Sequence, residues 1–302
     1  MAACSRQQPV PAVAMDAGFW SLWGDGQAEL SAYDLVYPRY GAPRQGTAVT
    51  IFVTEPFSRT LRVKADPGKH PEADVFPVMK LNLVEDFATG IYDYNESTSS
   101  FLALASNGHQ PMGALTKVSF SSQEWCGHSW AQWLRQPRGL DYVGHSYFDG
   151  EADRARTLDQ PARGLAEEQL FFWARGYAEP KLPPGGTVTV PFLRSLQHQR
   201  HAHREAVWTT ATLTRSAAPR SIETESGPAA VELWKAVIAE GPAIGFYVEP
   251  APPNRILRWE NTEGESARLI RSARLKYWQM NQPGGESALS MLGLKPRAAR
   301  TP

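Results

Sequence analysis

Short runs of aromatic and β-branched residues, each closed by a turn-forming cluster, recur along most of this chain of 302 residues. The runs at 32–41 and 46–57 flank the turn-rich pentapeptide APRQG, which is a hairpin pattern. Residues 115–122 alternate in character as a strand with one covered face does. The runs recur near the spacing of 8–12 residues that is typical of antiparallel barrels and sandwiches.

The order of these runs excludes one large class of folds. A doubly wound parallel sheet needs strands that alternate with helices, and no such alternation is present. The sequence therefore predicts a mostly β fold, either one strongly curved antiparallel sheet or two half-barrels side by side, with one or two short helices. Helix is expected at the centre of 162–178, whereas 227–243 fits a helix or a strand equally well.

Turn-forming residues predict where three of the hairpins reverse. We expect turns at Asn95–Ser97, at Asp149-Gly150 and at 261–264. One β-rich domain is expected over 19–294, with two similar halves near 19–150 and 151–294. Residues 1–18 are expected to form a tether, and 295–302 a flexible tail.

Charge and hydropathy narrow the class of protein further. Lys and Arg number 31, as do Asp and Glu, so no excess of positive charge favours nucleic acid as a partner. No run approaches the roughly 18–20 apolar residues that span a membrane as a helix. Contact with a membrane is therefore expected only through a covalent anchor.

The N-terminal residues point to such an anchor. Ala2-Ala3-Cys4 resembles the end of the lipid-attachment box of bacterial lipoproteins, and a polar stretch containing proline follows it. We expect Cys4 to carry a lipid and the protein to lie on the periplasmic side of a bacterial cell envelope. In that compartment Cys126 would be a lone thiol.

The segment QEWCGHSW, residues 123–130, contains Cys126. Its Trp-Cys-Gly-His resembles the motif of disulfide isomerases, but Ser129 stands where their second cysteine would be. An intramolecular dithiol cycle is therefore excluded. Cys126 with His128 as base, and His145 completing the group, would form a nucleophilic site. The favoured interpretation is structural, with Cys126 at the end of a packed strand and its thiol buried among indoles.

Two further clusters are candidates for chemistry. The trio His198, His201 and His203 has spacing that metal ligands can have, yet it lacks the Cys or acidic partners of a zinc finger, and no metal or cofactor is predicted. The carboxylates Glu85, Asp86 and Asp93, together with Glu151 and Asp153, would suit an acidic cleft for a sugar or a cation. The competing interpretation makes them turn residues that bond the local backbone.

Several long motifs carry a resemblance to a known family. They are RYG, GTAVTIFVTEPF, KLNLVEDFATGIYDYN, SFSSQEWCGH, SYFDGEAD, WARG, RILRWE and GESARLIRSARLKYW. From Phe19 to Leu294 the chain resembles bacterial envelope proteins of unknown activity, often lipoproteins, that carry the label "septum formation inhibitor". Inhibitors that deserve that label have a Ser-x-Ser-Pro-Arg-Arg signature, which this chain lacks.

A fainter similarity connects VTVPFLRSL and the C-terminal hairpin to periplasmic β-proteins of unknown function. It implies a curved sheet around an apolar hollow and assigns no catalytic residue. We therefore expect a binding protein for an apolar or amphiphilic ligand, or for an envelope protein, rather than an enzyme. The alternatives are a cysteine-dependent hydrolase or transferase and a structural scaffold. The expected ligand-lining residues are Trp125, Trp130, Trp133, Tyr92 and Tyr94.

Overall fold

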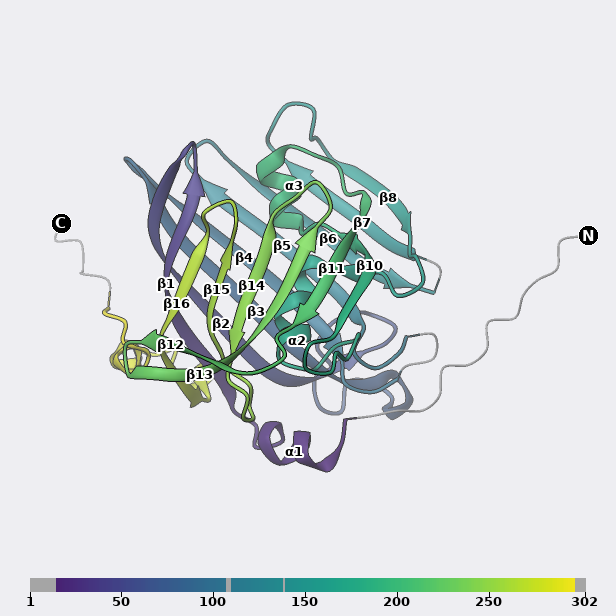
Figure 1. Cartoon of the computed structure of the whole chain (residues 1–302). Coiled ribbons are helices and arrows are strands. Elements are labelled where there is room, and N and C mark those ends of the chain that lie inside the picture. Colours follow the sequence, from purple (N-terminus) through teal and green to yellow (C-terminus); the bar gives the residue numbers. More distant parts are fainter. Residues whose placement is uncertain (1–14, 107–109, 138, 297–302) are drawn as a thin grey trace, which may run out of the picture.

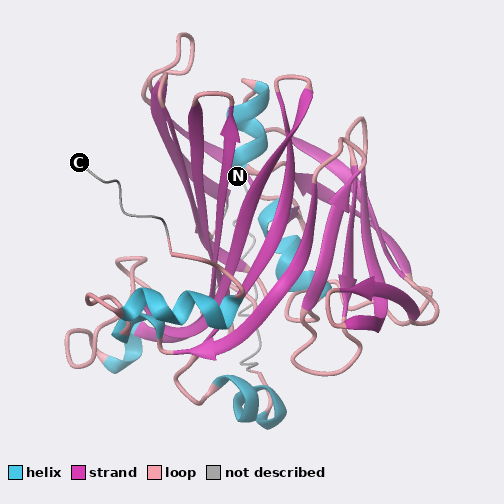
Figure 2. Cartoon of the chain, turned by 90° about the vertical axis from the view of Figure 1, so that its left-hand side faces the viewer, coloured by secondary structure: helices cyan, strands magenta, loops and turns pink. Residues whose placement is uncertain are grey.

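The computed structural model of the protein describes residues 15–106, 110–137 and 139–296. Its strands form one large curved sheet, as Figures 1 and 2 show. The strands are β1 (Ala28–Arg39), β2 (Ala42–Ser58), β3 (Val75–Thr89), β4 (Tyr92–Ala103), β5 (Leu115–Glu124), β6 (Gly127–Gln136), β7 (Gly139–Ser146), β8 (Arg154–Asp159), β9 (Leu165–Ala166), β10 (Thr187–Leu193), β11 (Trp208–Arg215), β12 (Arg220–Thr224), β13 (Gly227–Ile238), β14 (Ala243–Val248), β15 (Ile256–Asn261) and β16 (Ser266–Leu275).

Helical elements are short. The α-helices are α1 (Ala17–Trp23), α2 (Leu170–Ala174) and α3 (Leu196–Ala202), and the 3-10 turns are η1 (Glu72–Asp74), η2 (Glu167–Gln169), η3 (Tyr277–Gln279) and η4 (Gly285–Leu292). Within the described ranges, none of the helices combines the length and the apolar character that crossing a membrane requires. The prediction of a mostly β, curved antiparallel sheet with few helices is confirmed.

The strand order follows the chain in both directions from β1. Strands β1 to β8 form an antiparallel meander, and β16 pairs with the free side of β1. From β16 the order runs through β15, β14, β13, β11 and β10 to β9, whose pairing with β10 is parallel. In the part of the chain that the structure describes, β8 and β9 are therefore the two ends of the sheet. The β1–β16 pair joins the first and last strands of the sequence.

Two of the three predicted hairpin turns are confirmed. Residues 261–264 form the turn between β15 and β16, where Gly264 has a φ of 102°. Asp149-Gly150 lies in the turn between β7 and β8, where Gly150 has a φ of 74°. The turn predicted at Asn95–Ser97 is wrong, because all three residues lie inside β4. The reversal occurs instead just after Thr89, where Gly90 has a φ of 81° that few other residues tolerate.

The two helix candidates have different outcomes. The centre of 162–178 forms η2 and α2, as expected. Residues 227–238 form strand β13, which pairs with β11, β12 and β14. Pairing on both sides decides in favour of the strand at a place where the local pattern was ambiguous.

The concave side of the sheet is filled by α2, α3 and apolar side chains. Figure 1 shows these helices between the N-terminal strands behind and the C-terminal strands in front. Phe172 of α2 packs edge-on against Phe52 of β2, and Trp173 packs against Trp234 of β13. Because the rings of α2 contact both halves of the sheet, this short helix stabilises the curved arrangement of the strands.

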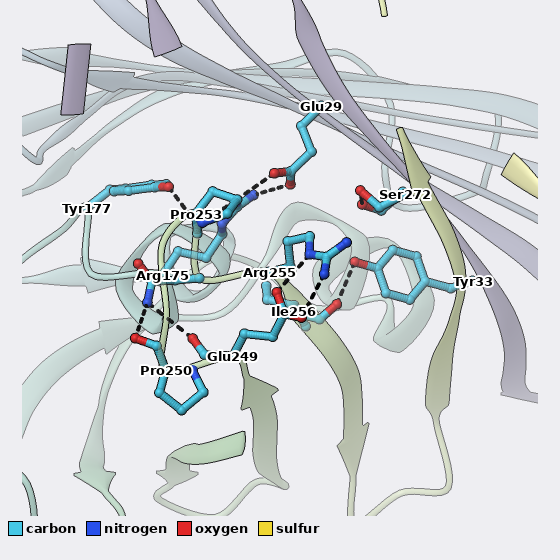
Figure 3. A network of polar contacts seen from close by, with 12 residues as sticks. Glu29, Tyr33, Arg175, Tyr177, Glu249, Pro250, Pro253, Arg255, Ile256 and Ser272 are labelled. Atoms are coloured by element: carbon cyan, nitrogen blue, oxygen red, sulfur yellow. Dashed lines mark hydrogen bonds and ion pairs between the residues drawn. The ribbon is translucent and has the colours of Figure 1, made fainter. Parts of the chain in front are cut away.

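A buried ion pair at the end of α2 reinforces this arrangement (Figure 3). Arg175 Nη1 lies 2.7 Å from Glu29 Oε1 of β1, and Arg175 Nη2 lies 3.0 Å from Oε2. The same guanidinium and the Tyr177 hydroxyl both donate to the carbonyl of Pro253, in the loop between β14 and β15. One charged group thus links the first strand, α2 and the C-terminal strands.

Candidate ligand-binding site

A chain of polar side chains crosses the inner face of the sheet. His201 of α3 has Nε2 2.7 Å from Glu96 Oε1 and Nδ1 2.7 Å from the Tyr37 hydroxyl. Ser122 also donates to Glu96. Burial alone would raise the pKa of Glu96, but His201, Gln197 and Ser122 together hold that pKa below its usual value. Glu96 is therefore a buried carboxylate whose charge is compensated.

Gln197 extends this network to a second buried carboxyl group. Its amide nitrogen donates to Glu85 Oε2 at 2.7 Å and to Glu96 Oε2 at 2.8 Å. Burial, with Glu265 and Glu96 nearby, raises the pKa of Glu85 well above its usual value. One amide therefore bridges two carboxyl groups with opposite tendencies to ionise.

Beside Glu85 lies a small cavity, the inner pocket, of about 70 Å³ between η2–α2 and strands β3, β4, β14 and β15. Its acidic lining residues are Glu85, Glu167, Glu168 and Glu265. Its aromatic lining residues are Phe171, Phe246 and Trp259. The pocket therefore combines carboxyl groups with an apolar wall.

Burial controls the acidity of this pocket. It raises the pKa of Glu168 to about 8 and that of Glu265 to about 7. Glu265 Oε1 accepts from Trp259 Nε1 and Oε2 accepts from Asn261 Nδ2, so both of its oxygens are bonded. Glu168 Oε1 accepts from the backbone of Leu196, whereas Oε2 is buried without a hydrogen-bond partner among the described residues.

A larger cavity lies beside β10. It is near the segment that connects β8, at one end of the sheet, to β9, at the other end. This seam cleft has a volume of about 580 Å³ and is bounded by residues 111–114, 162–165, 179–181 and 188–191 and by Arg135. Figure 1 shows β8 and β10 on the same side of the molecule. Strand β9 pairs only with Phe192 and Leu193, so the preceding part of β10 presents an uncovered edge on that side in the described structure.

The walls of the seam cleft combine apolar and polar surface, and its charged residues are mainly positive. The apolar lining residues include Met112, Ala114, Leu165, Val188 and Val190. The charged lining residues are Arg135, Arg163, Lys181 and Glu179. Burial lowers the pKa of Arg135 and of Lys181, and nearby Glu179 partly offsets the effect at Lys181.

A third cavity, the arginine cleft, lies between α3 and β5–β8 and has a volume of about 280 Å³. Arg154 and Arg156 both bond the Glu205 carboxylate. Arg200 is only 8% exposed and stacks on Phe148, with its Cζ 3.6 Å from the ring centroid. Glu205 thus compensates Arg154 and Arg156, whereas Arg200 Nε and Nη1 are buried without a hydrogen-bond partner among the described residues.

The expected burial of Cys126 is wrong. Trp125 and Cys126 form the two-residue turn between β5 and β6, and Cys126 is exposed. A tight turn points its side chains away from the sheet, so the flanking indoles cannot enclose the sulfur. The hydrogen bond and the charge of Glu124 raise the pKa of the Cys126 thiol, which works against forming a thiolate at neutral pH.

The two histidines proposed for that nucleophilic site lie on neighbouring strands. His128 is exposed on β6, opposite Gln123 of β5. His145 is opposite Trp130 on β7, stacks on that indole, and places Nδ1 2.9 Å from Asp153 Oδ1. The partners that orient His145 are thus an indole and a surface carboxylate.

The five aromatic residues expected to line a ligand site are dispersed. Trp133 and Tyr94 are buried in the core, at 3% and 1% exposure. Tyr92 lies between Tyr94 and the exposed Trp125, whose ring stacks on it. Trp130 borders the arginine cleft. The inner pocket is lined instead by Phe171 of α2, Phe246 of β14 and Trp259 of β15. The sequence does not single out these residues, because their segments are distant along the chain.

The three histidines of α3 and its C-terminal cap, His198, His201 and His203, have different environments. His201 belongs to the polar network, and His203 bonds Glu151. His198 lies 2.9 Å from Arg194 Nη2, and burial together with that guanidinium lowers its pKa to about 4. Across the described ranges, no three His, Cys, Asp or Glu side chains are grouped so as to hold a metal ion.

The predicted acidic cleft is not assembled either. Glu85 is buried on the inner face, while Asp86, the next residue, bonds Asn95 at an exposed position. Asp93 is exposed on β4. Glu151 and Asp153 bond His203 and His145 near the arginine cleft. Adjacent residues of a strand face opposite sides, which separates Glu85 from Asp86.

The comparisons with known proteins assign no family to this chain. No family model and no curated protein matches the chain. Among solved structures, a β-barrel-like protein of a domain of unknown function from Brucella abortus is similar, with 11% identity and a TM-score of 0.44. The match covers 83% of this chain and 99% of that one. Cys4, the predicted lipid-attachment residue, lies outside the described residues.

Proposed function

We propose that this protein binds an amphiphilic molecule with an acidic group, and that the seam cleft is its binding site. The supporting observation is a cavity of about 580 Å³ that pairs an apolar wall with an excess of positive charge. Its volume falls within the range of about 300–1,000 Å³ that small-molecule sites occupy. A scaffold would not require such a cavity.

The apolar wall accounts for the hydrophobic part of the ligand. Met112, Leu165, Val188 and Val190 come from three separate segments and line one cavity. Each buried methylene group of a ligand contributes about 0.8 kcal/mol. An alkyl chain in contact with this wall therefore gains a few kcal/mol in total.

The charged residues account for the acidic group. Arg135, Arg163 and Lys181 face the cavity together with one carboxylate, Glu179. Arg135 is half-buried, and burial is the sole cause that lowers its pKa. An anion beside this guanidinium would compensate its lost hydration, which favours a carboxylate or phosphate head over a neutral or cationic one.

The location of the protein belongs to the same proposal. A lipid on Cys4 and a polar tether would hold the domain at the periplasmic side of a bacterial envelope membrane. Amphiphilic molecules are abundant at that surface. An envelope protein that presents an acidic, apolar segment is the other partner that this chemistry would accommodate.

The proposal is tested by direct binding of 11-(dansylamino)undecanoic acid, whose fluorescence rises in apolar surroundings. We expect saturable binding that is displaced by laurate, less well by dodecanol and least by dodecyltrimethylammonium. Arg135→Gln should weaken binding by about tenfold, or ~1.4 kcal/mol. Val188→Trp, which fills the cavity, should weaken it further.

Arg268→Gln is the matched control, because Arg268 is an exposed residue of β16 outside the lining of the seam cleft. It should bind the probe as the unmodified protein does. Equal binding by all variants, or displacement that does not depend on head-group charge, would contradict the assignment of the seam cleft.

A further inference from the structure

The inner pocket is lined by carboxyl groups that have few cationic partners. No Lys, Arg or His occurs among its described lining residues, which include Glu85, Glu167, Glu168 and Glu265. Of these four, Glu167 alone forms an ion pair with a described cation, Arg194, at 2.6 Å. The lining of the inner pocket therefore favours a positively charged ligand and disfavours an anion.

One carboxyl oxygen in the pocket lacks the partner that its burial demands. Glu168 is 7% exposed, and its Oε2 has no hydrogen-bond partner among the described residues. Its other oxygen is held at 2.8 Å by the backbone N–H of Leu196, so the side chain is fixed in place. A buried polar atom without a partner is unfavourable, and a hydrogen-bond donor on a ligand would supply that partner.

Another part of the pocket lining is aromatic. Phe171 lies edge-on to Phe246, with ring centroids 5.0 Å apart, and edge-on to Trp259, with centroids 5.2 Å apart. Aromatic faces attract alkylammonium groups through their quadrupoles. Aliphatic side chains such as Leu170 and Ile244 complete the lining, and they favour carbon atoms next to the charge.

A bare metal ion fits this pocket poorly. Hard divalent cations prefer six or more oxygen ligands at short, defined distances. Across the described ranges no three acidic, histidine or cysteine side chains are grouped for that purpose. Much of the wall is apolar and would not replace the hydration shell of a metal ion.

We infer that the inner pocket is a second binding site, which takes a small organic ammonium group between Glu168 and the Phe171–Phe246–Trp259 wall. This site goes beyond the proposed function, because its charge preference is opposite to that of the seam cleft. The two cavities lie on different sides of one segment: Leu165 and Gln169 line the seam cleft, while Glu168 and Phe171 line the inner pocket.

Calorimetric titration with n-butylammonium chloride tests the inference, with sodium butyrate, 1-butanol, MgCl₂ and CaCl₂ as comparison probes. We expect binding of n-butylammonium alone. Glu168→Gln keeps the size of the side chain and the acceptor for Leu196, and should weaken binding at least about tenfold, as expected for loss of a charged hydrogen bond. Phe171→Leu removes one ring of the aromatic wall and should weaken binding by about three- to tenfold.

Proton release is the second readout. Buried carboxyl groups that are protonated at pH 7 must ionise when a cation binds beside them. The carboxyl groups that line the pocket with Glu168 are Glu85 of β3, Glu265 of the β15–β16 turn and Glu167 of η2. Arg194 pairs with Glu167 and contacts His198. Titration in buffers of different ionisation enthalpy should therefore show net release of protons, and less of it in Glu168→Gln.

Glu286→Gln, in an exposed part of η4, is the matched control and should bind n-butylammonium normally. The inference is overturned if n-butylammonium does not bind, if butanol binds equally well, or if Glu168→Gln leaves affinity unchanged while near-ultraviolet circular dichroism shows an intact fold. The dansyl probe reports on the seam cleft separately, so its failure would overturn the proposed function and leave this inference standing.

Discussion

At the scale of single residues, the inner face shows how the same side chain behaves differently with different neighbours. Glu96 has His201, Gln197 and Ser122 as partners, and its pKa falls. Burial raises the pKa of Glu168 to about 8, and the hydrogen bond from the Leu196 backbone offsets only part of this effect. The balance between desolvation and hydrogen bonding, rather than residue type, decides which carboxyl group is charged.

The raised pKa of Glu168 predicts how stability depends on pH. The folded protein holds this proton more tightly than the unfolded chain does, so the free energy of unfolding falls as pH rises from about 4.5 towards 8. Glu168→Gln removes that loss. From pH 5 to pH 8, the variant should gain about 1–3 kcal/mol of stability relative to the unmodified protein.

Urea unfolding at both pH values measures this effect, with Glu286→Gln as the control. A pH dependence that Glu168→Gln leaves unchanged would show that Glu168 is ionised without penalty in the folded protein.

At the scale of elements, the β3–β4 hairpin shows that polar residues alone do not locate a turn. Asn95, Glu96 and Ser97 have the composition of a turn, yet they continue strand β4 because Glu96 points inward to His201 and Gln197. The reversal needs a residue with positive φ, and Gly90 supplies it.

Replacement of Gly90 tests the conformational requirement of this hairpin. Gly90→Ala should destabilise the protein by about 1–2 kcal/mol, because its φ of 81° is unfavourable for a residue with a Cβ although no atom blocks the space. Gly18→Ala in helix α1 is the contrasting variant and should be about neutral, because a Cβ there would lie 3.3 Å from Asp16 Oδ1, which offsets the gain in helix propensity. Thermal unfolding of the two variants compares them, and similar behaviour would contradict this account of the turn.

At the scale of the whole molecule, a few contacts connect segments that are far apart in sequence. The β1–β16 pair joins the two halves of the strand order, and α2 packs between these halves of the sheet. The Glu29–Arg175 ion pair joins both regions and is almost completely buried. Its removal should therefore loosen the inner side of the sheet as a unit.

A double-mutant cycle tests this role. Glu29→Leu alone leaves the Arg175 guanidinium buried without its counter-ion and should cost about 3–5 kcal/mol of stability. Adding Arg175→Met removes the stranded charge, and the double variant should recover most of the loss. Guanidinium unfolding measures all four proteins. A double variant no more stable than Glu29→Leu would contradict the argument.

Alternation of side chains and the placement of turn residues are local, and they suffice to predict a mostly antiparallel β fold with a short helix near 170 and a turn at 261–264. Local sequence pattern does not indicate which strands pair across long distances along the chain. The β1–β16 pair, strand β13 and the three cavities described above therefore could not be predicted from the sequence pattern. Glu168 and Phe171 belong to the segment predicted as a helix, whereas Phe246 and Trp259 belong to two separate strands. The sequence therefore does not indicate that these four residues line one pocket. Cys126 was misplaced because tight turns expose side chains whatever their neighbours. Composition and period determine the kind of sheet, whereas long-range pairing determines which side chains meet, because a cavity exists only after distant segments have packed around it.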